Sequence, residues 1–311
     1  MRTSPGTRAK RSVREAVVPV TTPYRLDLTA VALRRLSTNV VDVFEDGAYR
    51  RLLGDPAAPA LLRVEQVAPD ALAVSIEGPG AEPFDPAAIV RRVLGTDVDL
   101  AAFYAGVAAV PWLDRIARAA RGVKPPRYPS LWETVCNAVV YQQVSIHAAG
   151  AILRRVIERN SSEVRTNGTR LFAFPAPRTL LEAEPAALRA AGLSVNKIAA
   201  LKAVAAALAD GALDEAVLER MPTPELIAAL VAHKGIGPWT AAVVALRGFG
   251  RLDVFPMKDS GVAAALRALS GDPATQAEPI IAALAPQQGM LYYHLLLGRL
   301  NATGEVTLSG M

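Results

Sequence analysis

The spacing of apolar residues changes once along the chain, near Leu100, and this change limits the folds that the sequence can adopt. Before Leu100, apolar and polar residues alternate in residues 24–28, 61–67 and 71–77, with Pro69-Asp70 as a turn between the last two. Alternation of this kind predicts half-buried strands. After Leu100 the apolar residues recur every three or four positions, which predicts helices. We therefore expect an α+β fold class, with a small N-terminal antiparallel β-sheet domain followed by an all-α domain.

Composition and pattern together predict four segments. Residues 1–22 mix Ser, Thr, Pro, Gly and basic side chains without an apolar face, which is typical of a flexible basic tail. We expect an α+β domain at 23–105, with helices at 31–36 and 86–94 packed on the sheet. A helical domain at 106–302 and a short C-terminal tail at 303–311 complete the chain. The length of 311 residues is enough for two domains.

The net charge says little about binding partners once the N-terminus is set aside. The 34 basic and 29 acidic residues give a net charge of +5, and five of the basic residues precede Glu15, the first acid. The remaining 29 basic and 29 acidic residues balance. A case for nucleic-acid binding must therefore rest on local groups. The basic tail is open to two interpretations, a solvated terminus or an aid in holding phosphates.

Several classes of site and location are excluded by composition. The single cysteine, Cys136, excludes an internal disulfide, a cysteine-based zinc site and a four-cysteine iron–sulfur cluster. The three histidines, His147, His233 and His294, are too scattered for a zinc site. No apolar run reaches the about 18–20 residues of a membrane helix, and no apolar segment follows the basic N-terminus as in a secretory signal. We expect a cytoplasmic chain with no membrane contact and no cofactor.

Residues 224–247 contain two apolar helical patterns joined by Gly235-Ile236-Gly237. Two glycines around one apolar residue allow a tight turn, with Ile236 between the helices and backbone N–H groups facing outward. The second helix begins there, so its unpaired N–H groups and positive dipole end suit a phosphate. A packing corner with Gly as a helix C-cap explains the same residues equally well.

A second candidate site follows at Asp259, where Val254-Phe255-Pro256 leads into another helical pattern. Taken alone, an Asp at this place is typical of a helix N-cap. A carboxylate also stabilises positive charge that develops on a sugar. An Asp at a helix start, downstream of a hairpin suited to phosphate, is a much rarer combination than either feature alone.

These segments resemble, in the same order, motifs of the helix-hairpin-helix DNA glycosylase superfamily, in its bacterial 3-methyladenine DNA glycosylase II branch. The resemblance covers about residues 100–302. In that branch the N-terminal domain resembles half of a TATA-binding protein, and this matches the β-rich part of the chain. The matching segments are Tyr141-Gln142-Gln143-Val144-Ser145, Ala191-Gly192-Leu193-Ser194 with Lys197, Gly235-Ile236-Gly237-Pro238-Trp239-Thr240-Ala241, and Asp253-Val254-Phe255-Pro256 leading to Asp259.

The resemblance implies a monofunctional DNA glycosylase of base excision repair, which flips out alkylated purines of the 3-methyladenine type and hydrolyses the N-glycosidic bond. Its partner would be double-stranded DNA with a damaged base, and we expect a monomer without an obligatory protein partner. Superfamily members that also cleave the strand carry a Lys in the hairpin region, where this chain has Trp239. Lys234 and Lys258 lie nearby, but we expect neither to act as a nucleophile.

The resemblance also assigns site residues. Asp259 would be catalytic, and the hairpin would hold a backbone-bound alkali ion. Gln142 and Gln143 would plug the emptied base stack, with Gln143 at the tip; the alternative is that both form interhelical hydrogen bonds. The DNA-phosphate ligands would be Gly235, Ile236, Gly237, Trp239 and Thr240, and the base-pocket aromatics would be Trp239, Tyr141 and Trp132. Aromatic residues at helical spacing are also typical of a core.

Two departures from the family pattern leave the substrate open. Val243 stands where some relatives have an aromatic ring, and residues 286–289 lack the aromatic and Arg residues often found before the last helix. The pocket is therefore expected to be less electron-rich. A glycosylase for deaminated or oxidised bases, and a non-catalytic helix-hairpin-helix DNA-binding protein, remain alternatives.

Overall fold

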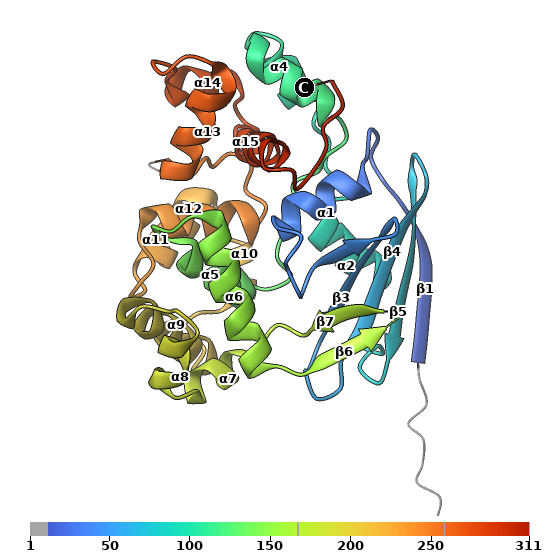
Figure 1. Cartoon of the computed structure of the whole chain (residues 1–311), viewed down its shortest axis with the longest axis vertical. Helices are drawn as coiled ribbons and strands as arrows, with labels where there is room; N and C mark the ends of the chain where they lie inside the picture. Colours follow the sequence, from blue (N-terminus) through green and yellow to red (C-terminus); the bar gives the residue numbers. More distant parts are fainter. Residues whose placement is uncertain (1–11, 167, 258, 311) are drawn as a thin grey trace, which may run out of the picture.

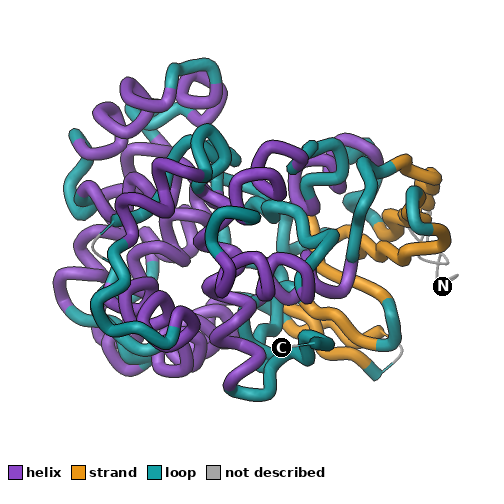
Figure 2. The backbone as a smooth tube through the Cα atoms, turned by 90° about the horizontal axis from the view of Figure 1, so that it is seen from above, coloured by secondary structure: helices purple, strands orange, loops and turns teal. Residues whose placement is uncertain are grey.

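Five strands form one antiparallel sheet, in the order β1-β5-β4-β3-β2. The computed structural model describes residues 12–166, 168–257 and 259–310. In Figure 2 the sheet lies on one side of the molecule and most of the helices on the other. The strands are β1 (Ser12–Pro19), β2 (Val43–Glu45), β3 (Ala48–Leu53), β4 (Ala60–Ala68) and β5 (Ala71–Gly78).

Two helices cover one face of this sheet (Figure 1). Helix α1 (Leu26–Arg34) contributes Leu26 and Leu33, and α2 (Pro86–Leu94) contributes Val90 and Val93, to a core that also contains inward-facing residues of β4 and β5. Asp85 caps α2 by accepting a hydrogen bond from the N–H of Ala87. The predicted hairpin of residues 61–67 and 71–77 and the predicted helix 86–94 are confirmed.

The predicted tail 1–22 is wrong for residues 12–19, which form β1. This strand pairs with β5 along its whole length, from Ser12 opposite Gly78 to Pro19 opposite Ala71. Without β1, the outer N–H and C=O groups of β5 would have no strand partner. Residues 1–11 lie outside the described residues, so the expectation of a flexible tail is untested there.

The predicted strand at 24–28 is also wrong, because α1 begins at Leu26. This helix is buried on two sides: Leu26 and Leu33 face the sheet, whereas Leu28 and Val31 pack into a core of the helical part. Burial on two sides places apolar residues at alternate positions and produces a period that resembles a strand. For a similar reason β3 was not predicted, since all six of its residues are buried and no alternation is left.

The helical part follows, and its helices are short. They are α3 (Ala101–Val107), α4 (Pro111–Ala119), α5 (Leu131–Tyr141), α6 (Ile146–Asn160), α7 (Pro177–Glu182), α8 (Pro185–Ala190), α9 (Val195–Ala209), α10 (Glu215–Glu219), α11 (Thr223–Val231), α12 (Pro238–Arg247), α13 (Ser260–Ser270), α14 (Ala277–Ala283) and α15 (Gly289–Ala302). No helix of the described residues is both long and apolar enough to cross a membrane.

The prediction of an all-α second part is wrong at one place. Strands β6 (Glu163–Thr166) and β7 (Thr169–Phe172) form a hairpin between α6 and α7. Leu171 of β7 packs with Leu52 of β3 in a small separate core, so the hairpin extends the contact between the two parts of the chain. The predicted C-terminal tail also packs on the body, because Leu308 is buried and the Glu305 carboxylate accepts a hydrogen bond from the N–H of Ser37.

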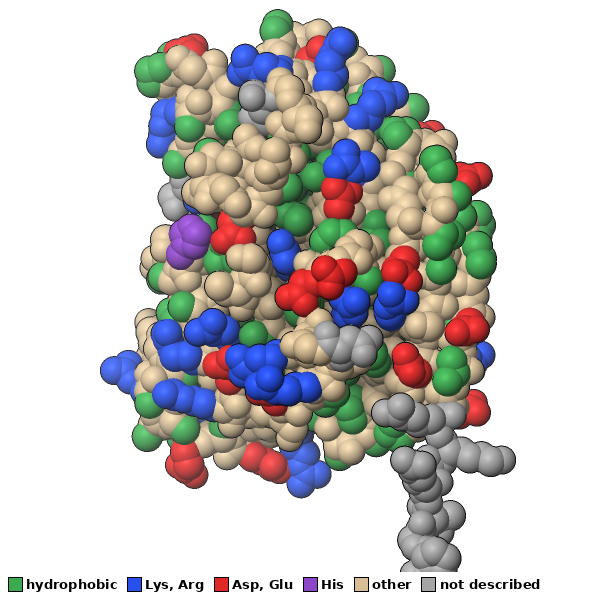
Figure 3. Space-filling model, turned by 45° about the vertical axis from the view of Figure 1, so that its right-hand side comes forward, with side chains coloured by type: hydrophobic (Ala, Val, Ile, Leu, Met, Phe, Trp, Pro, Cys, Tyr) green, Lys and Arg blue, Asp and Glu red, His purple; other side chains and the backbone are tan. Residues whose placement is uncertain are grey.

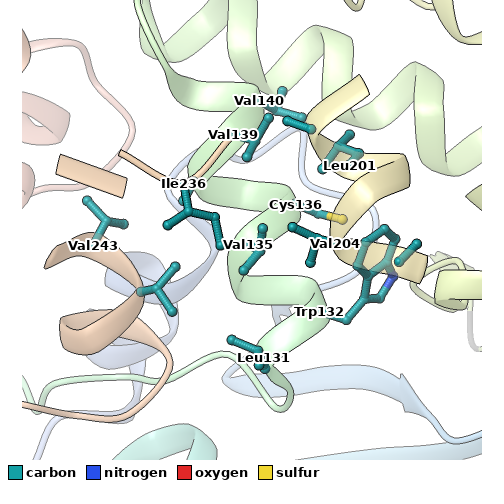
Figure 4. Packing of buried hydrophobic residues seen from close by; sticks show 14 of the residues in the cluster. Leu131, Trp132, Val135, Cys136, Val139, Val140, Leu201, Val204, Ile236 and Val243 are labelled. Carbon is teal, nitrogen blue, oxygen red and sulfur yellow. The ribbon is translucent and has the colours of Figure 1, made fainter. Parts of the chain in front are cut away.

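Two hydrophobic cores organise the helices. The first joins α5, α6, α9, α11 and α12, and Figure 4 shows part of it, including Trp132, Ile236 and Val243. The second joins α3, α4, α13 and α15, and it includes Leu28, Val31 and Ala32 of α1. The sheet part therefore shares a core with the helical part, although the sequence predicts a boundary at residue 105.

A buried ionic cluster holds the sheet against α5. Arg51 of β3 donates to Asp42 at 2.7 Å and to Glu133 at 2.8 Å, and the Tyr49 hydroxyl donates to Asp42 at 2.6 Å. Ser130 caps α5 by accepting from the N–H of Glu133. The Glu133 carboxylate binds Arg51 and does not return to the N–H of Ser130, so only the Ser130 half of a capping box is formed.

Arg51→Met is expected to lower the free energy of unfolding by about 3–5 kcal/mol, because it leaves two buried carboxylates without their cation. Urea unfolding at pH 7 measures this. Arg178→Met is a matched control, since the Arg178–Glu182 pair is exposed. The control should leave the urea midpoint unchanged, and a small effect of Arg51→Met would show that the cluster contributes little to stability.

Candidate active site

A cleft of about 1130 Å³ lies between the two helical cores. One wall consists of the α5–α6 turn, the start of α9 and the α11–α12 hairpin; the other consists of α13 and α15. The end of α1 also reaches the cleft. The polar and aromatic lining residues are Arg35, Tyr141, Gln142, Gln143, Ser145, Ser194, Asn196, Lys197, Trp239, Thr240, Asp259, Tyr292 and Arg299.

The α11–α12 hairpin has the geometry expected for a backbone anion site. Gly235 has φ +89°, and a Cβ atom there would lie 2.3 Å from the Cβ of Ala200, so both conformation and space require glycine. Ile236 is buried in the first core, while Gly237 and Pro238 are exposed. Gly237 is the N-cap of α12, so the N–H groups of the first turn have no helical partner.

Thr240 and Trp239, two of the expected phosphate ligands, have different environments. Thr240 is buried, and its hydroxyl accepts a hydrogen bond from Gln142 at 2.7 Å, so its side chain is engaged within the protein. The Trp239 side chain points across the cleft and donates from Nε1 to the Asp259 carboxylate. In Figure 3, Lys and Arg gather at the lower left of the face and elsewhere alternate with Asp and Glu.

The carboxylate of Asp259 is held at both oxygens. Oδ1 accepts from the N–H of Val262 at 3.0 Å, which makes Asp259 the N-cap of α13. Oδ2 accepts from the indole of Trp239 at 3.0 Å. Asp259 is therefore both a helix cap and a cleft residue. These two hydrogen bonds fix the position of the carboxylate at the N-terminus of α13.

Arg299 of α15 approaches the same place and was not singled out from the sequence. A Cβ atom at Gly261 would lie 2.6 Å from the Arg299 Nη1 atom and 3.1 Å from Asp259 Oδ1. The absent side chain at Gly261 thus leaves room for the guanidinium and the carboxylate on one side of the α13 N-terminus.

The two glutamines of the α5–α6 turn have different environments. Gln142 is half-buried and bound to Thr240 of α12, as in the interhelical alternative. Gln143 is exposed at the tip with φ 55°, a positive value that non-glycine residues rarely adopt. Lys197 supports the turn, since its ammonium donates to the carbonyls of Val140 and Gln142 at 2.9 Å. Burial lowers the pKa of Lys197.

Of the three predicted pocket aromatics, Tyr141 and Trp239 line the cleft and Trp132 does not. Trp132 is only 5% exposed, and its Nε1 donates to the Pro175 carbonyl within the first core. It precedes Tyr141 on α5 by nine residues, which corresponds to about 13 Å along the helix axis. The prediction for Trp132 is therefore wrong, and the alternative of a core residue is correct.

Sequence reasoning missed Arg35 and Tyr292 as cleft residues. Arg35 lies more than 100 residues before the first matching motif, and Tyr292 stands in an apolar run that predicts a core helix. The only local feature that could have pointed to a cleft residue there is the pair Tyr292-Tyr293, whose hydroxyl groups are unusual in an apolar run. Of the two lysines considered near the hairpin, Lys234 is exposed and does not line the cleft, and Lys258 lies outside the described residues.

Metal binding by side chains has no support within residues 12–166, 168–257 and 259–310, where no group of three His, Cys, Asp or Glu is placed to hold an ion. An alkali ion at the hairpin would need backbone carbonyls instead. The carbonyls of His233 and Gly237 each accept one backbone hydrogen bond, from Ile236 and Ala241, and each keeps a second lone pair. Carbonyl oxygens with a free lone pair are suitable ligands for an alkali ion, and the ion itself stays a prediction.

Known DNA repair proteins are similar to this chain in sequence. The family described as HhH-GPD superfamily base excision DNA repair protein matches residues 136–286. A Mycobacterium tuberculosis protein, named as a bifunctional transcriptional activator/DNA repair enzyme AlkA, is 28% identical over 81% of this chain and 50% of its own. The DNA-3-methyladenine glycosylase of Bacillus subtilis is 28% identical over 56% of this chain and 57% of its own.

A solved structure, the 3-methyladenine DNA glycosylase from Archaeoglobus fulgidus, matches with a TM-score of 0.73 and 23% identity, over 91% of this chain and 98% of that one. It shares the fold, with the sheet part and the helical part together. The chain spans about half the length of the curated relatives it matches. The matched segment includes the hairpin, the α5–α6 turn and Asp259. Residues 136–286, which carry the candidate site, therefore match the HhH-GPD superfamily of base excision DNA repair proteins.

Proposed function

We propose that the chain is a monofunctional DNA glycosylase, which acts as a monomer on double-stranded DNA and releases alkylated purines of the 3-methyladenine type by hydrolysis. The observation that carries the proposal is the Asp259 carboxylate, held across the cleft from the hairpin by the Trp239 indole. The names of the curated relatives, which are 3-methyladenine or DNA repair enzymes, support the same reaction.

The hairpin would hold the DNA backbone next to the damaged nucleotide. The N–H groups at the start of α12 offer hydrogen bonds and a positive dipole end to one phosphate, without reading bases. The nucleotide must leave the base stack to reach Asp259, at a cost of a few kcal/mol. Gln143, exposed at the tip of the α5–α6 turn, is placed to fill the vacated space, whereas Gln142 braces that turn against α12.

The reaction then breaks the bond between the sugar C1′ and the base nitrogen. The electron pair leaves with the base, so the sugar becomes positively charged in the transition state. The fixed Asp259 carboxylate stabilises this charge or orients the water that attacks C1′. The water supplies hydroxide to C1′ and releases its other proton to the solvent, because an alkylated purine of the 3-methyladenine type carries a positive charge in DNA and leaves as a neutral molecule. An abasic site remains.

Asp259→Asn should reduce base release by about 10²–10³-fold while leaving fold and DNA affinity unchanged, because Asn is also a good N-cap but carries no charge. Single-turnover assays on a 3-methyladenine duplex measure the loss. Asp214→Asn is the matched control, since Asp214 caps α10 on the outside of the cleft. An Asp259→Asn variant that releases the base at the wild-type rate would contradict the assignment.

The absence of strand cleavage is the second expectation. Trp239 occupies the position at which bifunctional members carry the amine that forms a Schiff base. Treatment of an enzyme–DNA reaction with borohydride should trap no covalent complex, and the product should break only after alkali. A trapped complex would overturn the monofunctional proposal and would place the nucleophile elsewhere, for example at Lys234.

Gln143→Ala should slow base release about tenfold, because no side chain then fills the space that the flipped nucleotide leaves in the base stack. A tenfold change in rate corresponds to about 1.4 kcal/mol. Fluorescence of 2-aminopurine beside the lesion measures flipping directly. Gln142→Ala instead removes the bond to Thr240 and should lower the melting temperature. Equal flipping by wild type and Gln143→Ala would mean that another residue fills the stack.

A further inference from the structure

Arg299 places a cationic side chain beside the carboxylate that we propose for the chemistry. It lies near the end of α15, lines the cleft and is half-buried. A Cβ atom at Gly261 would lie 2.6 Å from Arg299 Nη1 and 3.1 Å from Asp259 Oδ1, so the guanidinium and the carboxylate flank one small gap. The guanidinium therefore belongs to the α13–α15 wall, across the cleft from the α11–α12 hairpin.

The other two cationic side chains of the cleft are engaged within the protein. Lys197 donates to two carbonyl groups at the end of α5. Arg35 is buried and donates to the Tyr292 hydroxyl. In the parts of the chain that the structure describes, the hydrogen bonds of Arg299 involve its backbone, as with Thr303, and its guanidinium forms no hydrogen bond or ion pair. Its nitrogens are also not among the fully buried atoms without a partner.

Asp259 does not neutralise Arg299, although the two side chains are neighbours. Its Oδ1 accepts from the N–H of Val262 and its Oδ2 from the Trp239 indole, both at 3.0 Å, and no ion pair joins this carboxylate to Arg299. A guanidinium stays protonated in proteins. A full positive charge therefore lies in the cleft without a partner among the described residues.

This charge would oppose the proposed reaction if it stayed uncompensated. The sugar becomes positive in the transition state, and an alkylated purine of the 3-methyladenine type is itself a cation. Like charges that lie close together in a site of low dielectric repel each other strongly. An anion must therefore accompany Arg299 in the reacting complex. The DNA supplies such an anion, because a phosphate lies on each side of every sugar within a strand.

The two phosphates that flank the flipped nucleotide are the DNA anions nearest to its C1′. The α11–α12 hairpin is proposed to hold one of them from the wall of the first core. The sugar at Asp259 lies between the walls, so the other flanking phosphate is directed toward the α13–α15 wall, where Arg299 lies. A guanidinium suits this anion, because it binds a phosphate through two parallel, charge-assisted hydrogen bonds.

We propose that Arg299 binds this second phosphate, so that the DNA strand is held on both sides of the flipped nucleotide. The proposal rests on the proposed glycosylase function and adds a DNA ligand from α15, beyond the family-matched residues 136–286. Gly261 belongs to the same arrangement, since a side chain there would displace the guanidinium.

The first test measures affinity for a duplex with a tetrahydrofuran abasic-site analogue over a range of KCl concentrations. One phosphate contact contributes about 0.9 to the slope of log K against log salt concentration. Arg299→Gln should therefore reduce the magnitude of the slope by about 0.9 and weaken binding about tenfold at low salt. An unchanged slope would overturn the proposal.

Arg267→Gln is the matched control. Arg267 is an exposed arginine of α13 that does not line the cleft, so the substitution removes the same charge from a neighbouring helix. The slope should stay at the wild-type value. An equal loss of slope in both variants would show that net charge, and not a contact, causes the effect, and would overturn the proposal.

The second test identifies the phosphate. A neutral methylphosphonate replaces the phosphate on the 5′ side or on the 3′ side of the abasic analogue, one at a time. Each replacement should weaken wild-type binding about tenfold, because the hairpin holds one phosphate and Arg299 the other. Arg299→Gln should be insensitive to one replacement and stay sensitive to the other. Wild-type protein that tolerates either replacement, which needs no variant to observe, or a variant that is sensitive to both, would overturn the proposal.

Failure of this proposal is distinguishable from failure of the proposed function. The duplex carries no base at the site, so neither affinity nor slope depends on base release. A wild-type chain that shows the Arg299 contact but releases no 3-methyladenine would refute the proposed reaction and leave the contact standing. A wild-type chain that does not bind this duplex would refute both.

Discussion

The hydrogen bond from the Trp239 indole to the Asp259 carboxylate joins the two halves of the cleft. Trp239 belongs to the hairpin and packs on the first helical core, whereas Asp259 begins α13, which belongs to the second. The group proposed for chemistry and the element proposed to hold DNA are therefore positioned by one contact. Because Asp259 is also bound by the backbone of its own helix, the carboxylate has little freedom to rotate away.

Local patterns were enough to predict elements whose burial is one-sided. The β4–β5 hairpin alternates because one face is buried, and α2 has a cap at Asp85 and a glycine after its last turn. The helix-hairpin-helix was predicted for a different reason: its turn needs a glycine at Gly235, where φ is +89°, and this requirement is visible in the sequence. Elements buried on two sides were not predicted correctly: α1 gave a period near two, and β3 gave none.

The candidate site was predictable only where its residues lie in local motifs. Asp259 and Trp239 lie at the starts of helices and Gln143 lies in a turn, and all three line the cleft. Trp132 shares an amphipathic helix with Tyr141, and the sequence cannot tell which turn of such a helix reaches a cavity. Arg35 and Tyr292 approach each other from opposite ends of the chain, 257 residues apart. Only the packing of α1 against α15 brings them together, and no local pattern records that contact.

The burial of α1 on two sides has a consequence for the shape of the cavity. Its outer side completes the sheet, and its last turn closes the cavity that is otherwise built by a distant stretch of chain. Substitutions in this last turn can alter what the cavity accepts, while the α11–α12 hairpin and the Asp259 carboxylate stay unchanged. Two chains with the same hairpin residues can thus differ in the molecules that their cavities accept, because α1 lies outside residues 136–286, which the family model matches.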